Sequence, residues 1–322
     1  MDKSRLSPGG ATPDPLELRA LAMATEQRQR RARAMLQERA AACRDPALGR
    51  LLARAAAGNH QRATRTAAWL GRGKGLPPKT PPTEAAARRN TEDPLLRERI
   101  DVTPDLLILR MDRPAGFEYR AGQHVKMGVP GLLRTFSLVS APHEPHLEFF
   151  VELVPGGQLA ERLRPLRPGA AMALDARAKG DLSLDPARPR HLMVATVTGI
   201  APYVSLLRDH FHRGPGDRRF IVLVGASHGD ELGYRDELEA LAARHPGAVT
   251  VVPTISRPQD PRNAGWQGAT GRVDVLAATA AEDYGLAPGD TAVYACGNPG
   301  MVDAVASHFM AAGFAVYTEP YD

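Results

Sequence analysis

The chain has 322 residues, 43% of them hydrophobic, which is enough for two or three domains of roughly 100–150 residues each. It contains no run of about 20 apolar residues, so no membrane-spanning helix is expected, and its two cysteines exclude a disulfide framework and an iron–sulfur cluster. The net charge of +5 is uneven: residues 1–90 have 18 basic and 7 acidic residues, whereas residues 91–322 carry a net −6. Because the N-terminus lacks the apolar core of a secretory signal, we predict a cytoplasmic protein.

Residues 1–82 are predicted to form a basic helical extension with a Gly/Pro linker. Asp14-Pro15 and Asp45-Pro46 are typical helix starts, and Gly71–Pro82 has the composition of a linker. With 16 basic and 6 acidic residues, the segment would pack on the acidic remainder, dock to an acidic partner or extend into solvent. No nucleic-acid binding is expected, because its one aromatic residue is Trp69 and no binding motif is present.

Residues 94–187 predict an all-β antiparallel barrel. Turn residues separate short runs of β-type residues at intervals that suit such a barrel. The runs are Leu106–Met111, His124–Val129, Thr135–Val139 and Leu147–Val154.

Residues 188–322 show a different rhythm, in which apolar strands alternate with helices. The strands are expected at His191–Ala195, Phe220–Val224, Val249–Pro253 and Thr291–Tyr294. The helical patterns cover Val204–Phe211, Arg235–Arg244 and Met301–Ala311. This alternation predicts an α/β domain with a doubly wound parallel sheet.

Several of these strands end in residues that suit a bound nucleotide. In the predicted barrel, the stretch RTFS (134–137) presents a cation, a ring and a hydroxyl, which a plain core strand does not need. The turn ATVTGIAP (195–202) can offer backbone N–H groups and a helix start to a pyrophosphate. Ser256 and Arg257, with Arg272 further along, can bind a phosphate monoester. Each feature alone is more typical of an ordinary turn or solvated surface, and only their combination favours a nucleotide site.

Two further candidates lie near the C-terminus. Cys296 follows a strand in ACGNPGM (295–301), where a free cysteine is usually a small buried hydrophobe but can also contact a ring. Glu319 and Tyr321 belong to the terminal residues, which are usually frayed and would act only if the tail docks.

Taken in order, these motifs resemble those of the ferredoxin–NADP(H) reductase family from Pro94 to the end of the chain. RTFS resembles the flavin motif, and TGIAP resembles the NADP(H) pyrophosphate turn. ISR (255–257) resembles the 2′-phosphate site, ACGNPGM the nicotinamide turn, and TEPY (318–321) the C-terminal ending. YRAGQ (119–123) and GGQLA (156–160) are similar to two further turns of the family.

The resemblance implies specific roles for these residues. Ser137, Cys296 and Glu319 would be catalytic. The FAD-binding residues would be Arg134, Thr135, Phe136, Ser137, Val151, Gly156, Gly157, Gln158, Leu159, Ala160 and Tyr321. The residues that bind NADP(H) would be Thr198, Gly199, Ser256, Arg257, Arg272, Gly297 and Pro299. No metal site is predicted.

The chain departs from the family pattern at four positions. Phe136 replaces the commoner tyrosine, which keeps the stacking ring and loses the phenol. Ala160 replaces a serine or threonine, so that turn offers only backbone N–H groups. Val197 replaces a glycine whose missing Cβ lets a cofactor approach closely, and Ser227 stands where many bacterial members have an arginine. The last two changes would weaken binding of NADP(H).

The resemblance implies hydride transfer between NADP(H) and FAD, followed by single-electron exchange with a separate ferredoxin or flavodoxin. An NADH-dependent reductase that serves an oxygenase is the first alternative, and Ser256, Arg257 and Arg272 argue against it. A nucleotide-sensing regulatory flavoprotein is a second alternative, in which Val197 would block productive binding.

Overall fold

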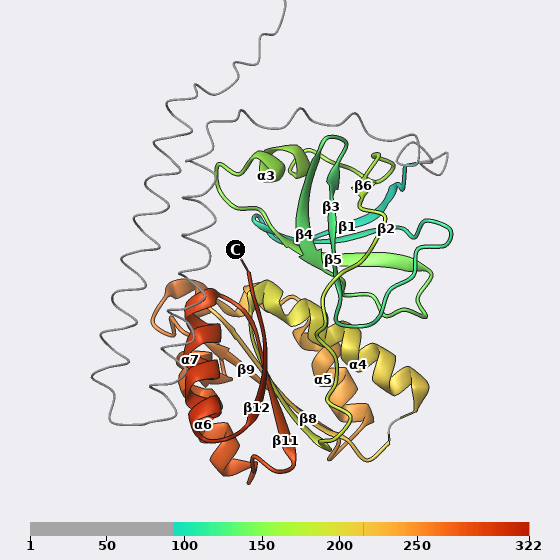
Figure 1. Cartoon of the computed structure of the whole chain (residues 1–322). Coiled ribbons are helices and arrows are strands. Elements are labelled where there is room, and N and C mark those ends of the chain that lie inside the picture. The colour runs from blue at the N-terminus through green and yellow to red at the C-terminus, as the bar shows by residue number, and fades with distance from the viewer. Residues whose placement is uncertain (1–92, 215, 322) are drawn as a thin grey trace, which may run out of the picture. The chain divides into compact units, whose positions relative to one another are not determined.

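The computed structural model describes residues 93–214 and 216–321 (Figure 1). The predicted basic extension, residues 1–82, lies outside these described residues. Within the described residues, no helix is long and apolar enough to cross a membrane.

The first part of the described chain contains two three-stranded antiparallel sheets. One has the order β1-β2-β5 and the other β4-β3-β6, and a bridge between Leu138 and Phe149 joins them. The elements are β1 (Leu96–Thr103), β2 (Leu106–Asp112), β3 (His124–Val129), β4 (Leu132–Ser137), β5 (His146–Glu152), α3 (Gln158–Leu163) and β6 (Ala173–Leu174). The predicted antiparallel β fold of this part is therefore confirmed.

Strand β2 is apolar on both faces, because both faces are covered. Leu107 and Leu109 point into the core enclosed by the two antiparallel sheets. Leu106 and Ile108, which alternate with them, pack into a second core that includes helix residues from the following domain. The sequence of a strand that is buried on both faces is a continuous apolar run, without the alternation of apolar and polar residues.

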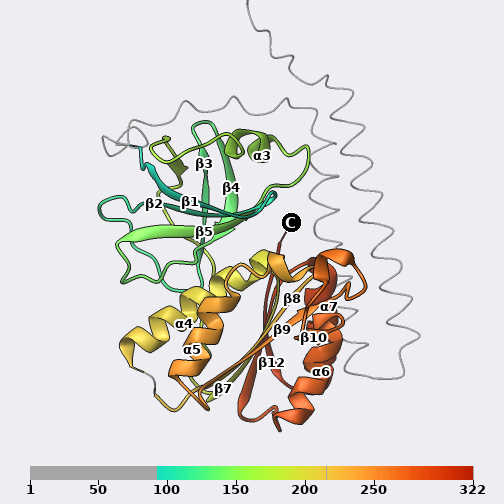
Figure 2. The ribbon, with the colours of Figure 1, turned by 180° about the vertical axis from the view of Figure 1, so that it is seen from behind.

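The second part is a six-stranded parallel sheet with helices on both faces (Figure 2). Its strand order is β10-β9-β8-β7-β11-β12. The strands are β7 (Arg190–Thr196), β8 (Arg219–Ala226), β9 (Val249–Ile255), β10 (Ala269–Thr270), β11 (Thr291–Gly297) and β12 (Ala315–Pro320). The helices are α4 (Ala201–Arg213), α5 (Arg235–Arg244), α6 (Val273–Asp283) and α7 (Pro299–Ala311), with 3₁₀ turns at Val197–Ile200, Gly229–Glu231 and Pro261–Asn263.

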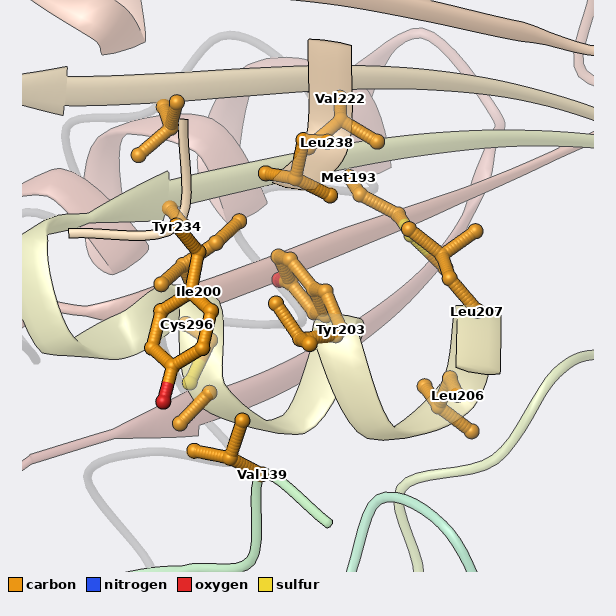
Figure 3. Packing of buried hydrophobic residues seen from close by; sticks show 14 of the residues in the cluster. Val139, Met193, Ile200, Tyr203, Leu206, Leu207, Val222, Tyr234, Leu238 and Cys296 are labelled. Atoms are coloured by element: carbon orange, nitrogen blue, oxygen red, sulfur yellow. The ribbon is translucent and has the colours of Figure 1, made fainter. Parts of the chain in front are cut away.

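Two apolar cores fix this sheet between its helices. Helices α4 and α5 pack on one face, where Tyr203 and Leu207 of α4 share a core with Met193 and Val222 of the strands (Figure 3). Helices α6 and α7 pack on the other face. The chain order reverses between β7 and β11, and the turns after such neighbouring strands commonly bound a ligand crevice.

The doubly wound parallel sheet predicted for this part is also confirmed. Two elements of this part were not predicted from the sequence. One is α6, an alanine-rich helix. The other is β12, which lies among the last residues of the chain, where fraying is usual. The predicted boundary between residues 187 and 188 falls between β6 and β7. The domain limits 94–187 and 188–322 stay a prediction.

A buried cluster of charges joins the barrel to helices α4 and α5. The Glu148 side chain of β5 is 0% exposed, and it accepts hydrogen bonds from Arg208 (3.0 Å), the Tyr234 hydroxyl (3.0 Å) and Arg110. Arg208 of α4 also donates to Glu237 of α5 (2.7 Å) and to Glu144 (3.3 Å). Burial alone would raise the pKa of Glu148, but the two guanidinium groups outweigh it and hold that pKa below its usual value.

Candidate functional site

Two cavities open at the carboxyl edge of the parallel sheet and beside the barrel. The sheet-edge cavity, about 520 Å³, is lined by the turns that follow β7, β8, β9 and β11. The barrel cavity, about 680 Å³, is lined by β3, β4, β5 and α3. Both volumes are within the range of ordinary small-molecule sites. Three residues line both cavities: Glu152, Thr198 and Tyr321.

The barrel cavity gathers most of the residues predicted to bind FAD. Arg134 lies exposed on its rim, where its guanidinium donates to the Leu133 carbonyl (2.9 Å). No acidic partner of Arg134 is found among residues 93–214 and 216–321, so its remaining N–H groups can meet an anion. The predicted residues that line this cavity are Arg134, Thr135, Phe136, Ser137, Val151, Gly157, Gln158, Leu159, Ala160 and Tyr321.

The C-terminal tail docks between the two cavities. Strand β12 pairs in parallel with β11, which sets Glu319 beside Cys296, and the Tyr321 N–H donates to the Gly297 carbonyl (3.0 Å). The Ser137 hydroxyl donates to Glu319 Oε1 (3.3 Å), although 182 residues separate them. The Tyr321 hydroxyl lies 3.2 Å from both Ser137 Oγ and the Thr198 carbonyl. The tail therefore connects the barrel to the turn after β7.

His124 of β3 is a member of this group that the sequence analysis missed. Its Nδ1 lies 3.0 Å from Glu319 Oε1, so the carboxylate of Glu319 is held from two sides, by Ser137 and by His124. His124 is the register partner of Ser137 across β3 and β4, which places both side chains on one face. Its position directly after YRAGQ was the available signal.

The protonation of the site residues follows from their burial. Cys296 is 0% exposed, and burial, followed by the negative charge of Glu319, raises the pKa of its thiol far above the usual value. Desolvation likewise raises the pKa of the Tyr321 phenol. Both groups are therefore protonated at neutral pH, and Cys296 is suited to packing and positioning rather than to nucleophilic attack.

The turns after β7 and β11 pack backbone against backbone. A Cβ at Gly199 would lie 2.3 Å from the Cys296 carbonyl oxygen, so only glycine fits there. Gly297 has a φ of 120°, and the Thr196 hydroxyl beside it accepts a hydrogen bond from the Asn298 N–H (2.8 Å). Gly199 and Cys296 thus lie behind the cavity wall and shape it without lining it.

Val197, in the turn after β7, has a strained backbone. Its φ is +43°, and within residues 93–214 and 216–321 it is the one non-glycine residue with a positive φ. A β-branched residue in this region is an outlier that costs on the order of 1–3 kcal/mol. Val197 also lines the sheet-edge cavity, at the position where the family pattern has glycine.

This strain can be tested by comparing Val197→Gly with Val197→Ala. The glycine variant should be the more stable of the two by about 1 kcal/mol, because alanine keeps the left-handed penalty that glycine escapes. Denaturant unfolding measures the difference. The same pair at Val275, which is exposed on α6, provides the control and should rank in the opposite order by about 1 kcal/mol. An alanine variant at position 197 as stable as the glycine variant would refute the strain.

At the far end of the sheet-edge cavity lie the residues predicted to bind a phosphate monoester. Ser256 and Arg272 line the cavity, and Arg272 pairs with Asp274 at 3.1 Å. Arg257 is exposed and does not line it. Three other residues predicted to bind NADP(H) line the same cavity at its other end: Thr198, Gly297 and Pro299.

The structure therefore brings most of the predicted residues to two adjoining cavities. Gly156, Gly199, Arg257 and Cys296 lie outside the cavity linings. Besides His124, the analysis missed Glu152, which ends β5 and lines both cavities. Desolvation and the carboxylates of Glu231 and Asp105 raise the pKa of Glu152. A charged residue at the end of an apolar strand was the signal for it.

Comparisons with known proteins agree with this arrangement. Residues 193–307 match the family model described as the oxidoreductase NAD-binding domain. Ferredoxin–NADP reductase B of Sorangium cellulosum is 35% identical over 217 residues, which cover 63% of this chain and 85% of that protein. The reductase component DmpP of the Pseudomonas phenol 2-monooxygenase is 32% identical over 66% of this chain and 59% of its own length.

The similarity to a solved structure covers a larger share of the chain. The ferredoxin NADP⁺ reductase of Neisseria gonorrhoeae, crystallised with FAD and NADP, matches with a TM-score of 0.63 at 26% identity. The match covers 71% of this chain and 97% of that one. An antiparallel barrel followed by a doubly wound sheet, with a tail docked between two cavities, together with these relatives, defines an oxidoreductase. The chain belongs to the ferredoxin–NADP reductase family.

Proposed function

We propose that this protein transfers hydride between NADP(H) and FAD and exchanges single electrons with a separate carrier protein. The observation that carries this proposal is the docked tail, which brings Glu319 and Tyr321 to Ser137 where the two cavities meet. The relative from Neisseria gonorrhoeae, which was solved with FAD and NADP, supports the same assignment.

The residues of the barrel cavity fit FAD. Arg134 lines this cavity and has no acidic partner among the described residues, so its guanidinium suits a pyrophosphate. Phe136 offers a ring for stacking on an aromatic heterocycle. Val151 forms an apolar part of the wall. Ala160 has no hydroxyl, so the turn that precedes α3 offers an anion only its backbone N–H groups.

The residues of the sheet-edge cavity fit NADP(H). Ser256 and Arg272 provide a hydroxyl and a guanidinium for a 2′-phosphate, and Arg257 lies next to Ser256 in the chain. At the other end, Thr198 and Gly297 belong to the two turns that border the shared region.

The chemistry itself belongs to the cofactor: FAD, when bound, would accept a hydride and pass its two electrons on one at a time, with release of the proton. The residues of this chain orient the reactants and handle protons. Ser137 presents its hydroxyl, Glu319 holds that hydroxyl, and the neutral Cys296 supports the turn beneath the tail. Tyr321 occupies the shared region and would have to move for a nicotinamide ring to enter it.

The one-electron carrier is proposed to be a ferredoxin or flavodoxin. The two cysteines of these 322 residues are too few to ligate an iron–sulfur cluster, which is consistent with a separate carrier. The names of the relatives from Sorangium cellulosum and Neisseria gonorrhoeae point to ferredoxin.

The function can be tested on the purified full chain. We expect a yellow protein whose absorbance reports bound FAD, and reduction of ferricyanide that is faster with NADPH than with NADH. Absence of flavin would contradict the proposal. A flavin-containing protein that shows no cofactor-dependent reduction would also contradict it and would favour the regulatory alternative.

Arg257→Ala should raise the KM for NADPH by roughly ten- to a hundredfold and leave NADH use nearly unchanged. The reason is the loss of a charge-assisted contact to the 2′-phosphate, which NADH lacks. Steady-state reduction of ferricyanide with each cofactor measures both values. An equal loss with both cofactors would remove Arg257 from this role.

A second candidate function is an NADH-dependent reductase of an oxygenase system. The similarity to the phenol 2-monooxygenase reductase component favours it, as do Val197 and Ser227, which line the sheet-edge cavity. The ratio of NADPH to NADH activity decides between the two candidates, since this alternative requires NADH to be preferred.

A further inference from the structure

The loop between β9 and β10 (residues 256–268) is fastened to the turn after β8 by one buried amide. The side chain of Asn263, a residue that is 5% exposed, donates from Nδ2 to the Arg257 carbonyl (2.8 Å) and to the Ser227 carbonyl (3.1 Å). Its Oδ1 accepts a hydrogen bond from the Gly229 N–H (2.9 Å). Asn263 thus uses both of its amide N–H groups and its oxygen.

This amide bridges two neighbouring strand ends at the rim of the sheet-edge cavity. Strands β8 and β9 pair in parallel up to Ala226 and Ile255, and Ser227 and Ser256 follow directly and line the cavity. Ser256 is already held at Ala226 by its own N–H (2.9 Å). The backbone of Arg257, one residue further, has left the sheet, and Asn263 holds its carbonyl.

We propose that Asn263 is a positioning residue that sets the preference of this site for a 2′-phosphorylated nucleotide. The proposal rests on the proposed function. Asn263 does not line the cavity and therefore acts through Ser227 and Arg257, whose separation it fixes. Without the amide, its three backbone partners lose these hydrogen bonds and Arg257 is no longer held next to Ser256.

A second set of contacts fastens the same loop and provides a matched control. Arg262 donates to Asp230 (2.8 Å), and the His228 ring lies 3.2 Å from Asp260 Oδ2. The side chains of Arg262 and Asp230 are 39% and 50% exposed, so water and salt screen their attraction. The buried neutral amide should therefore position the loop, and the exposed ion pair should contribute little.

The test is calorimetric binding of adenosine 2′,5′-diphosphate and of 5′-AMP to the full-length protein. Wild type should bind the diphosphate more tightly than 5′-AMP. Asn263→Ala should bind the diphosphate roughly tenfold more weakly and keep its affinity for 5′-AMP. Asn263→Asp, which retains the acceptor and loses both donors, should show the same loss of affinity for the diphosphate. Arg262→Ala should bind the diphosphate with an affinity within about threefold of wild type.

The outcomes separate this inference from the proposed function. A wild-type protein with no preference for the 2′-phosphate would overturn the NADP(H) assignment and this inference with it. If wild type prefers the diphosphate and both Asn263 variants keep that preference, the inference alone is wrong. An equal loss for the two nucleotides would also overturn it, because Asn263 would then maintain the fold rather than the specificity. Retained 5′-AMP binding shows that a variant is folded.

Discussion

Replacing Arg208 by methionine should lower the free energy of unfolding by roughly 3–5 kcal/mol, because it removes one partner from a buried charge cluster. Glu148, whose side chain is 0% exposed, would keep Arg110 and the His146 ring, which lies 3.8 Å away. Glu144 and Glu237 would lose their contacts with Arg208. Methionine retains much of the aliphatic volume of arginine. The decrease in the free energy of unfolding therefore comes from removing the charge and not from creating a cavity. Denaturant unfolding of both proteins at pH 7 measures it.

Arg213→Met on the same helix is the matched control. Arg213 pairs with Asp209 one turn away at 3.0 Å, and its side chain is 71% exposed. Such surface pairs contribute about 0–1 kcal/mol. If both variants lose the same amount, the cluster around Glu148 does not stabilise the junction between the barrel and helices α4 and α5.

Glu319→Ala should slow hydride transfer from NADPH about a hundredfold, the lower part of the range for a residue that handles protons in the transition state. Removing the carboxylate frees the Ser137 hydroxyl and the His124 ring, which both contact Glu319 Oε1. FAD should stay bound, since Arg134, Phe136 and Val151 lie elsewhere in the barrel cavity. Stopped-flow absorbance gives the reduction rate, and the flavin content of the purified protein gives the binding.

Glu319→Gln separates position from charge. The glutamine side chain keeps an oxygen that accepts from Ser137, so it should recover part of the rate if positioning matters. An unchanged rate in Glu319→Ala would mean that the docked tail plays no part in hydride transfer. Loss of flavin from that variant would mean instead that Glu319 supports the barrel cavity.

Much of the fold and part of the site could be predicted from sequence, because the relevant signals are local. The apolar run Phe220–Val224 predicts a buried strand from its own residues. The turn TGIAP likewise predicts the start of a helix from a few neighbouring residues. The same holds for RTFS, whose alternation along one strand presents Arg134 and Phe136 to the barrel cavity. Helix α6 was missed because a run rich in alanine shows a weak apolar periodicity.

The sequence by itself determined that a β-rich part precedes a part in which strands and helices alternate. It also determined the turns that border the cavities, and the resemblance supplied the expected roles of their residues. Only the tertiary structure decided which of these residues meet. Glu319 reaches Ser137 because β12 pairs with β11 in one register, and His124 joins them because β3 pairs with β4. Asn263 bridges Ser227 and Arg257 because β8 and β9 end side by side. Contacts of this kind depend on pairing between distant segments, and no local pattern of residue types encodes that pairing.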